Sequence, residues 1–114
     1  MSYDLKVSVK VDGTDFFAEV AEPEYNSPTY NLSEMFKKCM DWDFEQSKYY
    51  NCEKVIGNIE NGIRELWANP DKYTYEPENG WGSVYTARDA LESLRDCIYE
   101  NAKYIPLEHL WVKW

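Results

Sequence analysis

No run of apolar residues in this sequence is long enough to cross a membrane. A spanning helix needs about 20 consecutive, predominantly apolar residues, and the chain contains no such run. No apolar stretch of the kind found in signal peptides follows the first residues. We therefore expect neither a membrane partner nor a signal peptide.

Cysteine and histidine, the residues that most often build zinc sites and nucleophilic centres, are scarce. The chain has three cysteines, Cys39, Cys52 and Cys97, with no Cys-x-x-Cys spacing, and a single histidine, His109. An odd number of unpaired cysteines indicates reduced thiols in the cytoplasm, and the spacings do not match a structural zinc site. A catalytic pair would need His109 beside Cys52 or Cys97, whereas buried helical cysteines usually only pack. We predict no metal and no enzymatic activity.

The common catalytic and ligand-binding motifs are also missing. The sequence contains no phosphate-binding glycine loop, no Ser-x-x-Lys and no Gly-x-Ser-x-Gly element, so no cofactor is predicted. Asp41, Asp43 and Glu45 alternate as at the start of a calcium loop, but Gln46 occupies the position that requires glycine. A solvated acidic strand or turn is the simpler interpretation of these carboxylates.

The sequence contains fewer basic residues than acidic residues. Twelve Lys and Arg against 21 Asp and Glu give a net charge of -9, which repels nucleic acid and anionic membranes and favours basic protein surfaces. Hydrophobic residues make up 44% of the chain and aromatic residues 17%, enough for a folded core. At 114 residues, the chain is predicted to form a single domain over residues 1–114.

The strongest periodic pattern runs from Cys52 to Asn69 and predicts an amphipathic helix. Asn51 precedes it as an N-cap, and Asn69-Pro70 ends it. Gly57 and Gly62 each weaken the helix by about 1 kcal/mol relative to alanine, so we expect a close approach of another backbone to compensate. The apolar stripe consists of Val55, Ile56, Ile59, Ile63, Leu66 and Trp67.

Residues 3–11 alternate between apolar and polar side chains and predict a strand. Asp12-Gly13 resembles a two-residue hairpin turn, which places Val11 opposite Thr14 and Val9 opposite Phe16. In this register the apolar and charge patterns agree. The remaining predicted pairs are Val7 with Ala18, Leu5 with Val20, Lys10 with Asp15, and Lys6 with Glu19.

Two further helices and a closing strand are expected. Asn31 and Glu34 resemble a capping box that opens a short helix to about Met40, and Ser83 is the predicted N-cap of a helix to about Ala102. Residues 108–114 alternate again and predict a strand, whereas residues 41–50 leave strand, helix extension and loop open. The predicted fold is α+β, in the order β-β-α-α-α-β, with a small antiparallel sheet and helices packed on one face.

Two predicted loops combine aromatic residues with asparagines. Aromatic faces beside amide groups suit a planar ligand such as a nucleobase, or the anchors of a protein interface. The alternative is that the asparagines serve caps and turns beside core aromatics. Whether Trp81 lies in the core or on a contact surface is not decided by the sequence. The candidate binding residues are Tyr25, Tyr30 and Asn31 in the first loop, and Tyr75, Asn79 and Trp81 in the second.

Several short motifs recur in one family. The chain opens Met-Ser-Tyr-Asp, has Tyr-Asn-x-Ser-x-x-Phe from Tyr30 to Phe36 and Gly-Ile-x-x-Leu from Gly62 to Leu66, and contains Asn-Pro and Asn-Gly-Trp-Gly segments. On these motifs it resembles a family of small uncharacterised phage and prophage proteins. The resemblance implies phage or prophage origin, and therefore the cytoplasm of a bacterial host, but it brings no activity with it.

Charge and resemblance together predict a non-enzymatic phage protein that inhibits a host defence component, in the manner of an anti-CRISPR protein. Its acidic, aromatic-bearing surface would occupy a basic surface of a host protein such as a nuclease, without contacting nucleic acid directly. The alternative is a sponge, possibly a homo-oligomer, that sequesters a nucleotide signal between the two loops. An anionic ligand needs cations nearby, and the candidates are few: Lys48, Lys72 and Arg88.

Overall fold

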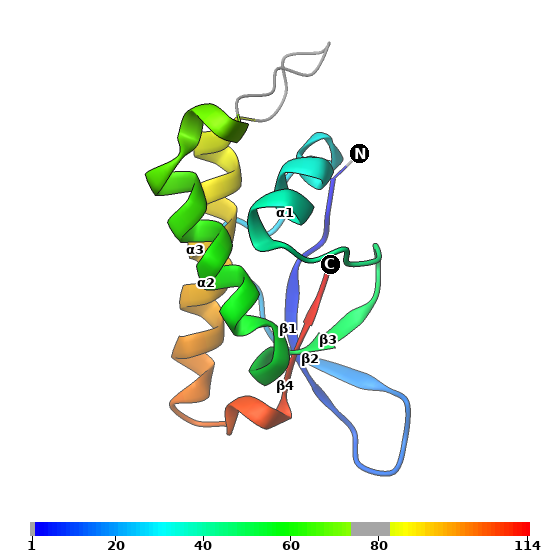
Figure 1. The fold of residues 1–114 in the computed structure, drawn as a ribbon. Helices are drawn as coiled ribbons and strands as arrows, with labels where there is room; N and C mark the ends of the chain where they lie inside the picture. The colour runs from blue at the N-terminus through cyan, green and yellow to red at the C-terminus, as the bar shows by residue number, and fades with distance from the viewer. Residues whose placement is uncertain (1, 74–82) are drawn as a thin grey trace.

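The computed structural model describes residues 2–73 and 83–114, which form a four-stranded antiparallel sheet with the helices packed against one face (Figure 1). The strand order across the sheet is β2-β1-β4-β3. This confirms the predicted α+β class and adds one short strand, β3, directly before α2. The strands are β1 (Lys6–Lys10), β2 (Phe17–Ala21), β3 (Tyr49–Asn51) and β4 (Leu110–Lys113), and the α-helices are α1 (Ser33–Met40), α2 (Cys52–Ala68) and α3 (Val84–Ala102).

Helix α2 begins and ends where the sequence predicts. The Asn51 side chain accepts a hydrogen bond from the Glu53 N–H at 3.1 Å, and Asn69 follows the last helical residue. Of the predicted apolar stripe, Val55, Ile59, Ile63 and Leu66 are buried and Ile56 is half-buried, whereas Trp67 is 58% exposed. Assigning Trp67 to the core is therefore wrong. It lies at the margin of the stripe, where its ring covers the Arg88 guanidinium of α3 instead.

The two glycines of α2 have different environments. A Cβ at Gly62 would lie 2.6 Å from Met40 Cγ and 3.0 Å from Leu91 Cδ1, so α1 and α3 both approach the helix at this point. The prediction that another backbone approaches these glycines is wrong: at Gly62 the neighbouring helices approach through side chains. A Cβ at Gly57 would meet nothing within 4 Å, and that glycine is exposed.

Helix α3 matches its predicted position, whereas β4 begins two residues later than predicted, because Leu107–His109 form a 3-10 turn. The Ser83 Oγ accepts the Thr86 N–H at 3.2 Å, and the Thr86 Oγ1 accepts the Ser83 N–H at 2.8 Å, which completes a capping box. In β4 the alternation is as expected: Leu110, Val112 and Trp114 are buried.

Residues 41–50, which the sequence leaves open, form mainly a loop that packs against the end of the chain. The buried Trp114 ring stacks on Phe44 at 4.7 Å and meets Trp42 edge-on at 5.8 Å. The Tyr3 and Phe36 rings complete this aromatic cluster from the other side. After the loop, β3 pairs with β4.

The predicted capping box at Asn31 and Glu34 is wrong. A 3-10 turn, η1 (Tyr30–Leu32), precedes α1, and it is Thr29 whose Oγ1 accepts the Asn31 N–H at 3.3 Å. Thr29 has the extended backbone that an N-cap requires, whereas Asn31 already lies inside the turn. Helix α1 then starts at Ser33, with no side-chain cap.

The predicted hairpin register is wrong as well. Val11 pairs with Phe16 and not with Thr14: its N–H donates to the Phe16 carbonyl oxygen at 2.8 Å across a four-residue loop. The Thr14 side chain stabilises this longer loop, because its Oγ1 donates to the Val11 carbonyl at 2.8 Å and accepts the Phe16 N–H at 3.1 Å. Val9 consequently lies opposite Ala18, and a bulge then places Val7 opposite Ala21.

The change of register redistributes the side chains of β2. Phe16 is 75% exposed, and Phe17 turns to the face of the sheet opposite the helices, where its ring stacks on Tyr49 of β3 at 3.9 Å. This contact joins the two edge strands over the buried Ser8. The predicted charge pairs form in spite of the shift: Lys10 lies 3.9 Å from Asp15, and Lys6 lies 3.7 Å from Glu19.

The two glycines of α2 provide a matched test of this packing. Gly57→Ala should stabilise the domain by about 0.5 to 1 kcal/mol, because it improves helix propensity without a clash. Gly62→Ala should destabilise it by roughly 1 to 3 kcal/mol, because the new methyl group overlaps Met40 and Leu91. Denaturant unfolding measures both changes, and a stabilising Gly62→Ala would contradict the packing described.

A second test concerns the buried stripe of α2. Ile59→Asp or Leu66→Asp should unfold the domain, because both side chains are fully buried and an unpaired core charge costs several of the roughly 5 to 15 kcal/mol available. Arg64→Asp, on the exposed side of the same helix, should melt cooperatively near the wild-type temperature. Circular dichroism distinguishes these outcomes, and a wild-type melt for either core variant would refute the core assignment.

Candidate functional site

The first predicted loop is tied to the core. The Tyr30 ring packs edge-on against the buried Tyr3 ring at 4.7 Å, and Tyr25 is half-buried against the core. The Tyr25 N–H donates to Ser93 Oγ of α3 at 2.8 Å, and Asn31 lies within the 3-10 turn. In this loop the aromatic rings contact the core, and a role of these residues in binding stays a prediction.

The second predicted loop cannot be compared in the same way. Tyr75, Asn79 and Trp81 lie outside the described residues. A pocket formed between the two loops therefore stays a prediction, and so does the position of Trp81.

The candidate thiol nucleophiles and the single histidine differ in their exposure. Cys39 and Cys52 are buried free thiols, and burial raises the pKa of each to about 12, so both stay protonated near neutral pH. His109 is exposed and lies 3.8 Å from Glu108. Within residues 2–73 and 83–114, no three His, Cys, Asp or Glu side chains lie close enough to hold a metal ion.

The carboxylates that resemble the start of a calcium loop are separated from one another. Asp41 ends α1 in a left-handed conformation, Asp43 pairs with Lys37 at 3.5 Å, and Glu45 pairs with Lys48 at 2.6 Å. Each of these two ion pairs turns a carboxylate toward a lysine, so the three acidic side chains do not form a cation site.

An exposed aromatic patch, not predicted from the sequence, lies where α2 ends and α3 begins. The Arg88 guanidinium carbon lies 3.6 Å from the centre of the Trp67 ring and 5.2 Å from that of Tyr85. The Trp67 Nε1 donates to Glu92 at 2.6 Å, and Tyr85 is 67% exposed. These contacts hold two large exposed rings in fixed positions, as interface anchors require. In the sequence, Tyr85 and Arg88 are three residues apart, a spacing that places two side chains on the same side of a helix and could have indicated this contact.

An acidic pocket of about 410 Å³ separates the end of β2 from α3. It contains four carboxylates and no lysine or arginine among its lining residues. Two of the carboxylates have a cation just outside: Asp96 pairs with Arg95 at 3.0 Å, and Glu100 pairs with Lys103 at 2.9 Å. The lining consists of Ala21, Glu22, Glu24, Ser93, Asp96, Cys97, Glu100 and Asn101.

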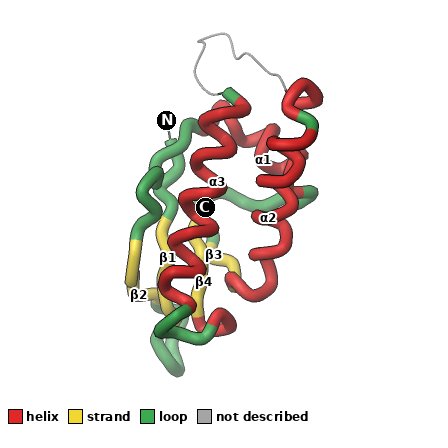
Figure 2. The backbone as a smooth tube through the Cα atoms, turned by 90° about the vertical axis from the view of Figure 1, so that its left-hand side faces the viewer, coloured by secondary structure: helices red, strands yellow, loops and turns green. Residues whose placement is uncertain are grey.

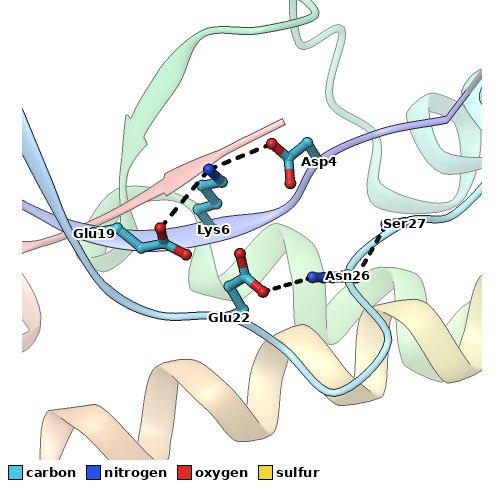
Figure 3. Close-up of polar contacts among 6 residues, drawn as sticks. All are labelled: Asp4, Lys6, Glu19, Glu22, Asn26 and Ser27. Carbon is cyan, nitrogen blue, oxygen red and sulfur yellow. Dashed lines mark hydrogen bonds and ion pairs between the residues drawn. The ribbon is translucent and has the colours of Figure 1, made fainter.

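The acidic character extends from this pocket along β2. Residues 15–24 contain four carboxylates, Asp15, Glu19, Glu22 and Glu24, and no basic residue. Figure 3 shows Lys6 of β1 between Asp4 and Glu19, and Glu22 accepting a hydrogen bond from the Asn26 side chain at 2.8 Å. The negative charge of Asp4, and to a smaller extent that of Glu19, raises the pKa of Lys6. We call residues 15–24, together with Asp96 and Glu100, the acidic edge.

A larger depression, of about 720 Å³, lies between the hairpin tip and residues 105–111. Its lining contains three carboxylates, Asp12, Asp15 and Glu108, together with Lys10 and His109. The pocket at the end of β2 differs from it in having four carboxylates and no lysine or arginine in its lining, so the acidic edge is the more distinctive surface.

Comparison of the sequence with models of protein families, with characterised proteins and with solved structures finds no match. The resemblance to phage proteins is therefore untested, and function has to be argued from geometry and charge. Among the described helices, none combines the length and the apolar character that crossing a membrane requires.

The buried thiols lead to a direct prediction. At pH 8, Cys39 and Cys52 of the folded protein should react with a disulfide reagent roughly a thousandfold more slowly than an ordinary thiol, because a pKa of about 12 leaves little thiolate. All three cysteines should react at once in denaturant, and reductants or chelators should leave the melting temperature unchanged. Peptide mapping of the labelled protein identifies each site, and rapid native labelling of Cys52 would contradict its burial.

Proposed function

We propose that this protein is a non-enzymatic binding protein, of phage or prophage origin, that inhibits a host defence component by docking its acidic, aromatic-bearing surface on a basic protein surface. The observation that carries the proposal is the acidic edge. Its six carboxylates come from two parts of the chain far apart in sequence, and no lysine or arginine interrupts residues 15–24.

The charge distribution supports a basic partner. Glu19 lies on β2, Asp15, Glu22 and Glu24 flank that strand, and Asp96 and Glu100 lie on α3, where four of these carboxylates line one pocket that a single partner surface could contact. Opposite potentials speed association and disfavour partners of the wrong charge. A basic channel that binds nucleic acid in a nuclease has the complementary potential, and occupying it would block the enzyme without any chemistry.

The exposed aromatic residues would provide the contacts that hold a formed complex together. Rim charges mainly affect the rate of encounter, whereas buried aromatic anchors hold a formed complex. Trp67 and Tyr85 are exposed and fixed by Arg88, on the same helix pair that carries Asp96 and Glu100. Trp81 lies two residues before the N-cap of α3 in the sequence and is proposed as a further anchor.

Capture from cells tests the proposal against the sponge alternative. Tagged protein is recovered from infected host cells, and both the co-purifying proteins and the small molecules released by heat are identified. The proposal expects a basic host protein at stoichiometric amounts, whose purified activity falls when the protein is added. A nucleotide at near one-to-one stoichiometry, with no protein partner, would favour the sponge and overturn the proposal.

Kinetics with the captured partner should separate the two contributions. Association should slow sharply as salt rises, because the screening length is only about 8 Å at 0.15 M ionic strength. Trp67→Ala and Trp81→Ala should instead raise the dissociation rate and leave the salt dependence nearly unchanged, because anchors act after the encounter. Surface plasmon resonance measures both rates. A salt-independent association rate would contradict an electrostatic interface.

A further inference from the structure

The outer edge of β2 is open. In the strand order β2-β1-β4-β3, β2 pairs only with β1 among the described strands. Figure 2 shows β2 as the outermost strand, with no described segment beyond it. Its side chains offer little cover, since Ala18, Glu19 and Val20 are all exposed. An open edge of this kind is a template for pairing with another extended chain.

The register indicates which backbone groups face outward. The Val11 N–H donates to the Phe16 carbonyl and the Phe16 N–H donates to Thr14 Oγ1 within the loop, so Val11 and Phe16 direct their backbone groups toward each other. Such pairs alternate along an antiparallel ladder, which makes Ala18 the next residue bonded to β1. Phe17 and Glu19 therefore direct their N–H and C=O groups away from β1, toward the free edge. An added strand would bond to these two residues.

Charge determines which chain the edge can accept. Glu19 lies in the middle of β2, Asp15 precedes the strand, and Glu22 and Glu24 follow it. A strand with lysine or arginine at alternate positions would place its cations along these carboxylates. The acidic pocket at the end of β2 is large enough to receive one such side chain between Glu24 and Asp96.

The same charges argue against a second copy of this chain. Two β2 strands paired antiparallel about their centres would bring Glu19 against Glu19. Asp15 would then lie opposite Pro23, next to Glu22 and Glu24, and like charges brought together across strands are destabilising.

We propose that β2 binds an extended, basic segment of the partner protein as a fifth strand of the sheet, with one of its cationic side chains in the acidic pocket. This inference rests on the proposed function, and it names both the surface and the kind of partner segment involved. The backbone of Phe17 and Glu19 supplies the hydrogen bonds, and the carboxylates of the acidic edge select a basic chain.

A synthetic peptide tests this without the natural partner. The probe is an acetylated and amidated heptapeptide of alternating lysine and valine, and its affinity is measured by fluorescence anisotropy at low salt. A control peptide has proline in place of the central valine, which keeps the charge but prevents strand pairing. The proposal expects the control to bind at least tenfold more weakly. Equal affinity of the two peptides would overturn it.

Two variants of the protein separate backbone from charge. Glu19→Ala removes the carboxylate but keeps the outward N–H, and it should weaken binding about twofold to threefold. Glu19→Pro also removes the N–H, and it should weaken binding at least tenfold while β2 keeps its bonds to β1. A Glu19→Pro protein that melts cooperatively and binds like Glu19→Ala would overturn the proposal. If Glu19→Pro does not fold, the comparison of the two peptides still tests whether the bound segment pairs as a strand.

A charge-matched pair tests the location. Glu22→Lys/Glu24→Lys and Glu34→Lys/Glu53→Lys each change the net charge from -9 by +4, to -5, at exposed positions. The first pair, in the pocket, should lower peptide affinity at least fivefold more than the second, on α1 and α2. Equal losses would show that only overall charge matters and would overturn the inference. The protein could fail these peptide tests and still capture a basic host partner from cells. That result would overturn the strand-pairing interface and leave the proposed function standing.

Discussion

The fold depends on one close approach, at Gly62, where α2 meets its two neighbouring helices. Because Gly62 has no side chain, Met40 and Cys39 of α1 and Leu91 of α3 all reach the surface of α2 there. The buried sides of the three helices then face one another and the sheet, so α3 presents its other side outward. That outward side carries Asp96 and Glu100 toward the end of β2, and the acidic pocket follows from it.

The exposed strand β2 is the least covered part of the sheet, and charge compensates for that exposure. An uncovered edge normally invites pairing between copies of a protein, and charged side chains along the edge resist it. Glu19 and its neighbouring carboxylates have this effect on β2. In the proposed interface the same residues would select a basic chain, so resistance to self-association and choice of partner would have one physical origin.

The elements with strong local signals could be predicted, and those that depend on distant contacts could not. Helix α2, the Ser83 cap and the alternation of β4 are local patterns, and the structure confirms them. The hairpin register failed because Thr14 stabilises a longer loop than Asp12-Gly13 suggests. Nothing in the spacing of Glu24 and Asp96, 72 positions apart (96 − 24), indicates that they line one pocket. The prediction that Trp67 belongs to the core failed because Trp67 lies at the margin of its stripe, where a tertiary contact with Arg88 decides its exposure.

The central claim is that the acidic edge is the binding surface of this protein. Hydrogen–deuterium exchange, measured by mass spectrometry on the free protein and on the protein saturated with its captured partner, tests it most directly. The account predicts slower exchange in peptides covering residues 17–24 and 93–101, with the slowest amides in β2. Slower exchange confined to α1 and to the N-terminal half of α2, with β2 unchanged, would contradict it.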